Sequence, residues 1–140
     1  MEPVYIHSIV VSQSVIDANG HASNIEFIRW MQEAAVAHAD AAGCTAATRD
    51  AGATWVVRSH QIEYLRPAMV NDQVQIRTSV ADFRRAFSRR KYEFVRQADQ
   101  AVLARGETNW VFLDIATSRP KSIPPHIAAM FELLPDEQKP

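Results

Sequence analysis

The polar segment 17–24, Asp-Ala-Asn-Gly-His-Ala-Ser-Asn, places one carboxylate a few residues before a segment with helical apolar spacing. The Asn-Gly pair at 19–20 marks a tight turn, and Ser23 or Asn24 is a suitable N-cap for the helix that follows. The first N–H groups of a helix have no partner inside it, so they are free to bind an oxyanion. The segment therefore combines the two groups that hydrolysis of a polarised carbonyl needs, a carboxylate and hydrogen-bond donors. Asp17 would attack the carbonyl or activate water, and backbone N–H groups would receive the negative oxygen.

The same residues also have ordinary structural interpretations. The Asp17 side chain could accept a hydrogen bond from the backbone of Asn19, which is a common use of Asp beside Asn-Gly. Asn24 could serve only as a helix cap, a role compatible with binding an oxyanion through its backbone. His21 either orients Asp17 and lines the site, or packs at the helix entry with its ring bonded to the backbone. His60 either points at a substrate or is a half-buried structural histidine.

One long helix and a set of strands must position these residues. Apolar residues recur every three or four positions from 27 to 42, which predicts a helix of about five turns that Gly43 ends. Alternation and β-branched content predict strands over 5–14, 55–66, 73–83, 89–96 and 101–114, with a possible bulge at Gly106. Short helices are expected within 45–53 and 125–134, and a frayed polar tail from Asp136. This order predicts an α+β fold in which an antiparallel sheet curls around the helix.

Composition narrows the function classes. The 140 residues form one domain, 1–140, large enough for a core without metal or disulfide. The net charge of -1 argues against a nucleic-acid partner, and the single cysteine, Cys44, excludes an intrachain disulfide. The five histidines show no metal-site spacing, and four glycines are too few for a phosphate-binding loop. No G-x-S-x-G motif occurs, and no apolar run approaches the roughly 20 residues of a membrane span. We therefore expect no metal, no membrane insertion and a cytoplasmic location.

Four segments in order carry a resemblance to a known family: 17–24, 27–34 (Phe-Ile-Arg-Trp-Met-Gln-Glu-Ala), 56–68 with Asp72, and 119–124 (Arg-Pro-Lys-Ser-Ile-Pro). The chain resembles the hotdog-fold acyl-CoA thioesterases, specifically the 4-hydroxybenzoyl-CoA thioesterase family and its Tol-Pal-associated relatives. The resemblance implies a hotdog fold with about five strands. It also implies that Asp17 is catalytic and that the backbone N–H near Asn24 polarises the thioester carbonyl. Two positions depart from the family pattern, Val15 for a second acidic residue and Phe27 for Tyr, and both bear on acyl preference.

The resemblance also suggests where coenzyme A binds. Arg89, Arg90, Lys91 and Arg119 are candidate contacts for its phosphates, because guanidinium groups match phosphate oxygens bidentately. The alternative is a solvated hairpin that carries charges. No other cofactor is implied, since coenzyme A belongs to the substrate. Another branch of hotdog thioesterases uses a helix glutamate, which makes Glu33 a rival carboxylate. Glu33 lies roughly 13 Å along the helix from Asn24, too far to share its oxyanion hole within one subunit.

The function expected from these features is hydrolysis of an acyl-CoA thioester to the free acid and CoA. The substrate would lie across a subunit interface, because hotdog domains pair as homodimers and often as homotetramers. Two alternatives remain open. One is a hotdog hydratase or dehydratase acting on acyl thioesters, and the other is a noncatalytic acyl-binding or scaffold protein.

Overall fold

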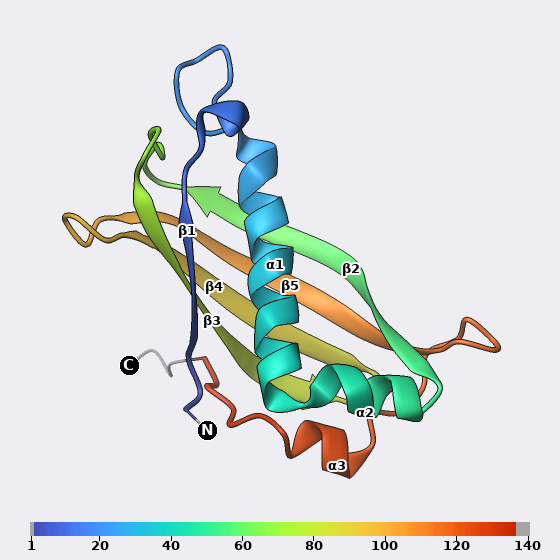
Figure 1. The fold of residues 1–140 in the computed structure, drawn as a ribbon. Coiled ribbons are helices and arrows are strands. Elements are labelled where there is room, and N and C mark those ends of the chain that lie inside the picture. The colour runs from blue at the N-terminus through green and yellow to red at the C-terminus, as the bar shows by residue number, and fades with distance from the viewer. Residues whose placement is uncertain (1, 137–140) are drawn as a thin grey trace.

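The computed structural model describes residues 2–136 (Figure 1). Five strands are β1 (Tyr5–Val10), β2 (Ala53–Tyr64), β3 (Gln73–Arg84), β4 (Phe87–Arg96) and β5 (Val102–Asp114). Three α-helices are α1 (Asn24–Ala42), α2 (Cys44–Asp50) and α3 (Pro125–Ala128), and a 3-10 turn, η1, covers Gln13–Val15. Along the described chain, a strand and a long helix precede four further strands, as the sequence predicts. Only β3, β4 and β5 form a meander, because β2 pairs with β5 at the far edge of the sheet.

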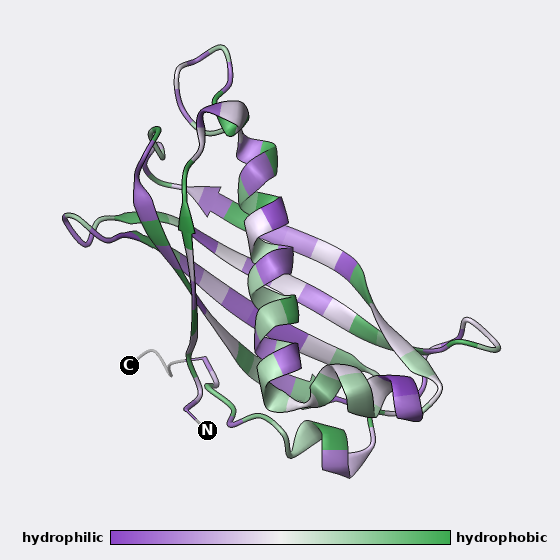
Figure 2. Ribbon diagram, viewed as in Figure 1, coloured by the Kyte–Doolittle hydropathy of each residue, from purple (hydrophilic) through white to green (hydrophobic). Residues whose placement is uncertain are grey.

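The strands form one antiparallel sheet in the order β1-β3-β4-β5-β2. Helix α1 crosses one face of this curved sheet, with α2 and α3 at the end opposite the 17–23 loop (Figure 1). The buried residues of α1 are mostly apolar, and polar positions recur along its outer side (Figure 2). This arrangement confirms the expected α+β hotdog architecture.

The limits of α1 follow from two local features. At its start, the Ser23 hydroxyl accepts a hydrogen bond from the Ile25 N–H at 3.3 Å, which is the N-cap geometry. At its end, Gly43 adopts the left-handed conformation with φ +83°, where a side chain would be strained. Between them, the side chains on the apolar face are buried against the sheet: Phe27, Trp30, Met31, Ala34, Ala35 and His38.

The prediction of a bulge at Gly106 is wrong. Gly106 pairs in continuous register with Tyr92 on β4 and Ile62 on β2, and the register shifts lie elsewhere. A Cβ atom at Gly106 would lie 2.9 Å from the Met31 Cε, closer than carbon atoms pack. The glycine therefore allows α1 to approach the sheet closely at this point.

Two other boundaries differ from the sequence prediction. The first strand ends at Val10, because the chain turns into η1 after the Val11 N–H bonds to the Asp72 carbonyl. The last helix covers only Pro125–Ala128, and the chain then runs beside β3, where the Leu134 N–H bonds to the Val80 carbonyl. Of the predicted tail, only Asp136 lies within the described residues. Among residues 2–136, no helix has both the length and the apolar character to cross a membrane.

Candidate functional site

The loop that carries Asp17 is closed at its base by backbone hydrogen bonds. The Asp17 N–H donates to the His21 carbonyl at 2.9 Å, and the Ser23 N–H donates to the Val15 carbonyl at 3.0 Å. Ile16 and Ala22 form an isolated antiparallel bridge between these bonds. The loop therefore returns to its starting point, with Asp17 opposite His21 and with Ser23, the residue before α1, opposite Val15.

The Asp17 carboxylate is half-buried and uses one oxygen to hold the turn. Its Oδ1 accepts a hydrogen bond from the Asn19 N–H at 2.9 Å. No residue within 2–136 forms a hydrogen bond or an ion pair with Oδ2. The turn-stabilising interpretation of Asp17 is thus observed, and it leaves the second oxygen available.

The first N–H of α1 has no internal partner among the described residues. The Asn24 N–H forms no hydrogen bond there, while its carbonyl accepts one from the Tyr64 hydroxyl at 2.9 Å. Tyr64 also packs edge-to-face against Phe27, with 5.4 Å between ring centroids. Residues at the end of β2 therefore fix the start of α1, a contact across 40 positions that no local sequence pattern reveals.

The two other residues considered beside Asp17 lie as follows. The His21 Nδ1 lies 3.4 Å from the Ala22 carbonyl oxygen, and no hydrogen bond joins its ring to Asp17 within residues 2–136. Glu33 is on the exposed side of α1, and its carboxylate lies 3.9 Å from the His7 Nε2 of β1. Neither side chain contacts Asp17, so a role for His21 in orienting that carboxylate stays a prediction.

The four basic residues proposed to bind coenzyme A are not brought together. Arg89 and Lys91 project from the outer face of β4, and both form ion pairs with Asp136. Arg90 alternates to the inner face beneath α1, where it is only 5% exposed. Arg119 lies on the exposed loop after β5 and forms no ion pair with any residue in 2–136.

The structure gathers a different basic cluster. Arg58 of β2 and Arg84 and Arg85 at the turn between β3 and β4 line a hollow together with Ser59, Phe87 and Asn109. The Arg58 guanidinium lies 5.2 Å from the Phe87 ring centroid, which is a cation–π contact. Sequence analysis missed Arg58 because it is far from the other two in the chain, and a register shift beside it sets its position.

A row of polar side chains crosses the inner face of the sheet under α1. Arg90 pairs in register with Thr108, which pairs with His60. The His60 Nδ1 lies 2.8 Å from the Thr108 hydroxyl, and its Nε2 lies 3.5 Å from the Gln32 side chain of α1. Burial lowers the pKa of His60, so its ring is neutral near pH 7. This confirms a half-buried histidine and places it under the helix.

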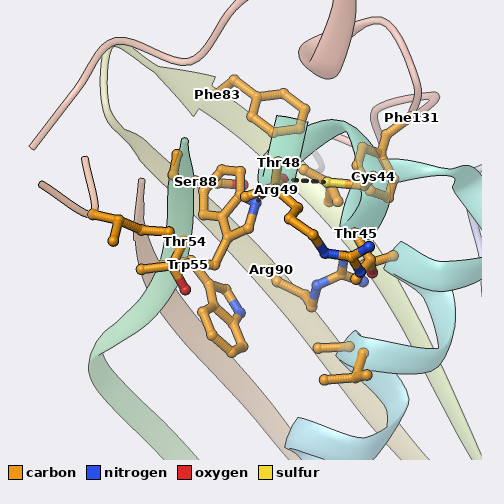
Figure 3. A pocket seen from close by; sticks show the side chains of 17 residues that line it. Cys44, Thr45, Thr48, Arg49, Thr54, Trp55, Phe83, Ser88, Arg90 and Phe131 are labelled. Carbon is orange, nitrogen blue, oxygen red and sulfur yellow. Dashed lines mark hydrogen bonds between the residues drawn. The ribbon is translucent and has the colours of Figure 1, made fainter. Parts of the chain in front are cut away.

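A cavity of about 500 Å³ lies beside this row, between the second half of α1, helix α2 and the sheet (Figure 3). Arg90, Trp110 and Trp55 are among its lining residues, and Asp17 is not. The loop and the cavity are at opposite ends of α1, whose 19 residues span about 28 Å.

Sequence comparison decides the family. The family model described as the thioesterase-like superfamily matches residues 11–131. This chain belongs to the thioesterase-like superfamily. The predicted relationship to hotdog-fold thioesterases is therefore confirmed for family and fold. No curated protein matches this chain in sequence.

Solved structures that resemble this chain have the same fold. A Lactobacillus plantarum protein, named for a proposed oleoyl thioesterase activity, has a TM-score of 0.85 and 23% identity. The match covers 97% of this chain but 54% of that protein, so this chain spans about half its length. The 1,4-dihydroxy-2-naphthoyl-CoA thioesterase of Synechocystis has a TM-score of 0.78 at 15% identity, covering 86% of this chain and 90% of that one. The DHNA-CoA thioesterase of Staphylococcus aureus also has a TM-score of 0.78, at 19% identity, covering 85% and 80%.

Proposed function

We propose that this chain is an acyl-CoA thioesterase that hydrolyses an acyl-CoA thioester to a free acid and CoA. The observation that carries the proposal is the closed 17–23 loop directly before α1, which leaves one carboxylate oxygen of Asp17 and the Asn24 N–H without partners among residues 2–136. Membership of the thioesterase-like superfamily supports thioester hydrolysis over other carbonyl chemistry. The coenzyme A thiolate is a good leaving group, so one carboxylate and an oxyanion site suffice without a strong general acid.

Two routes use the same residues. In the first, the Asp17 carboxylate attacks the thioester carbon, the C–S bond breaks, and a mixed anhydride forms that water then hydrolyses. In the second, Asp17 takes a proton from water, and the hydroxide attacks the carbon as the thiolate leaves. In both, the Asn24 N–H donates to the developing oxyanion, with further stabilisation from the positive end of the α1 dipole. In oxygen-18 water, a single turnover by the first route, with water attacking the Asp17 carbon of the anhydride, leaves an Asp17 oxygen in the acid and the label on Asp17. The second route places the label in the acid.

We propose that the phosphates of coenzyme A bind among the exposed arginines of the sheet. The hollow formed by Arg58, Arg84 and Arg85 concentrates three guanidinium groups, and Arg119 adds one that has no ion-pair partner among residues 2–136. Arg89 is already balanced by acidic partners, which include Asp82 at 3.0 Å. It is therefore a weaker phosphate ligand than its position in the basic run suggests.

The proposed assembly is a homodimer formed through β2. This strand is the outermost on its side of the sheet and is 12 residues long, so it leaves a long row of unpaired backbone groups. Pairing with β2 of a second copy gives those backbone groups hydrogen-bond partners. It also brings the start of α1, which Tyr64 of β2 contacts, to a subunit interface where an acyl-CoA would lie.

The decisive experiment measures thiol release from a panel of acyl-CoA substrates for the wild type and Asp17→Asn. Asparagine still accepts the hydrogen bond from the Asn19 N–H, so the turn is retained while the nucleophile or base is lost. We expect kcat to fall by about 10²- to 10⁴-fold, with CoA binding unchanged. Asp50→Asn, which removes an exposed carboxylate on α2, is the matched control and retains the wild-type rate.

Other results favour the alternative functions. If the wild type releases no thiol from any substrate but binds acyl-CoA, it is an acyl-binding protein. Hydration of an enoyl-CoA without thiol release identifies a hydratase. Full activity of Asp17→Asn contradicts the proposed role of Asp17.

A further inference from the structure

Arg90 is a buried cation without a counter-ion among the described residues. Its Nη1 donates to the His38 Nδ1 at 2.9 Å and to the Thr78 hydroxyl at 3.1 Å, and its guanidinium carbon lies 5.8 Å from the Phe131 ring centroid. These partners carry no negative charge, and no carboxylate within residues 2–136 forms an ion pair with Arg90. Burial of an uncompensated charge is strongly unfavourable, which indicates that the balancing group comes from a ligand.

The cavity beside Arg90 has the size and the walls of a small-molecule site. Its volume of about 500 Å³ lies within the range of known ligand pockets. Aromatic and aliphatic side chains form much of its wall, among them Trp55, Val80, Phe83 and Phe131 (Figure 3). Such walls suit the apolar body of an amphipathic molecule.

The polar groups of the cavity that lack partners are donors. The Arg90 Nη1 makes the two hydrogen bonds above, and no residue within 2–136 accepts a hydrogen bond from its Nε or Nη2. By contrast, the Thr48 hydroxyl already accepts from the Trp55 Nε1 at 3.1 Å, and the Ser88 hydroxyl donates to the Asp82 carbonyl at 3.0 Å. The site therefore needs a ligand that accepts hydrogen bonds and carries negative charge.

We propose that this cavity binds an amphipathic organic carboxylate, with its head group against Arg90 and its apolar body against Trp55 and Phe83. A carboxylate has two acceptor oxygens that match the parallel N–H groups of a guanidinium. The site does not depend on the proposed hydrolysis, because Asp17 lies at the other end of α1 and outside the cavity.

Titration of the full chain with octanoate tests the proposal directly. Two of the three tryptophans, Trp55 and Trp110, line the cavity, so their fluorescence reports its occupancy. We expect saturable binding of one octanoate per chain. We expect no binding of octylamine, which has the same tail and a positive head, or of acetate, which lacks the tail. Backbone amide NMR shifts should change in α2 and the adjoining end of β2, and not in the 17–23 loop.

Matched variants test whether octanoate binds to the Arg90 charge and between the apolar walls of the cavity. Arg90→Met removes the buried guanidinium and should weaken octanoate binding by about 10- to 100-fold. Arg105→Met removes an exposed arginine of β5 and should leave binding unchanged. Ala39→Phe fills the cavity from α1 without altering Arg90, and should also abolish binding. Equal affinity for octanoate and octylamine in the wild type, unchanged binding by Arg90→Met, or NMR shifts confined to the 17–23 loop would each overturn the proposal.

Discussion

The guanidinium Nη1 of Arg90 lies 2.9 Å from the Nδ1 of His38, beneath the second half of helix α1. A guanidinium only donates hydrogen bonds, so the His38 Nδ1 must accept, and the neutral ring carries its proton on Nε2. Burial, followed by the charge of Arg90, lowers the pKa of His38 to about 4. The pair therefore fixes both the tautomer and the protonation state of a histidine inside the core.

This pair makes the stability of the protein depend on pH. The unfolded chain binds a proton at His38 near pH 6.5, whereas the folded chain binds it only near pH 4. The stabilising contribution is thus complete above pH 6.5 and is lost as the pH falls from 6.5 to 4. We expect a loss on the order of 3 kcal/mol in the free energy of unfolding, measured by urea denaturation across this range.

A non-titrating variant is the control for this prediction. His38→Asn retains an acceptor for the Arg90 Nη1 and has no pKa in this range. Its free energy of unfolding should change less between pH 6.5 and 4 than that of the wild type. A small slope should remain, since burial also lowers the pKa of His60. Identical slopes for the two proteins would show that His38 is not the titrating group.

Because α1 lies close to β5, we expect that adding a single methyl group at Gly106 lowers the free energy of unfolding. Gly106→Ala places a Cβ atom 2.9 Å from the Met31 Cε and 3.1 Å from its Sδ. Met31 is fully buried but flexible, so we expect a loss of about 1 kcal/mol in stability, and more for Gly106→Val. When Gly106→Ala is combined with Met31→Leu, the loss in the free energy of unfolding should be less than the sum of the losses in the two single variants. Urea unfolding of the four proteins measures this coupling.

The junction between α1 and α2 predicts a second glycine effect, which is of backbone origin. Gly43 has φ +83°, and a Cβ atom there would meet nothing within 4 Å. Gly43→Ala should therefore destabilise by about 1 kcal/mol through strain alone. Gly43→Asn should cost less, because asparagine tolerates this conformation better. Thermal unfolding of both variants checks the order, and an alanine variant as stable as the wild type contradicts the argument.

The open edge of β2 predicts the mass of the protein in solution. If two copies pair along this strand, light scattering should give at least twice the 15.7 kDa of one chain. Amide hydrogens along the outer edge of β2 should then exchange slowly with solvent, as those in the middle of a sheet do. A monomer with fast exchange along β2 contradicts the proposed dimer.

Sequence patterns predicted the elements that depend on local rules. The spacing of Phe27, Met31 and Ala34 identified α1, and Gly43 marked its end, because helix periodicity and left-handed caps are properties of a few neighbouring residues. The length of the last helix could not be predicted this way. It stops at Ala128 because the following residues contact β3, far away in the chain.

The candidate site was predicted only in part, for the same reason. Asp17 and Asn24 are close in sequence, and the loop closure that relates them is local. The contact of Tyr64 with Asn24 and the clustering of Arg58 with Arg84 depend on which strands become neighbours. Residue type alone also grouped Arg90 with its neighbours, although the alternation of a strand separates them.

Strand β4 places two consecutive arginines in opposite environments, Arg89 among surface carboxylates and Arg90 in the interior. Insertion or deletion of one residue before this point would turn Lys91 and Glu93 into the apolar interior and expose Phe94 and Tyr92 to water. Such a register shift is unfavourable on both faces of the sheet. The alternation of charged and apolar side chains along β4 therefore favours one pairing of the central strands.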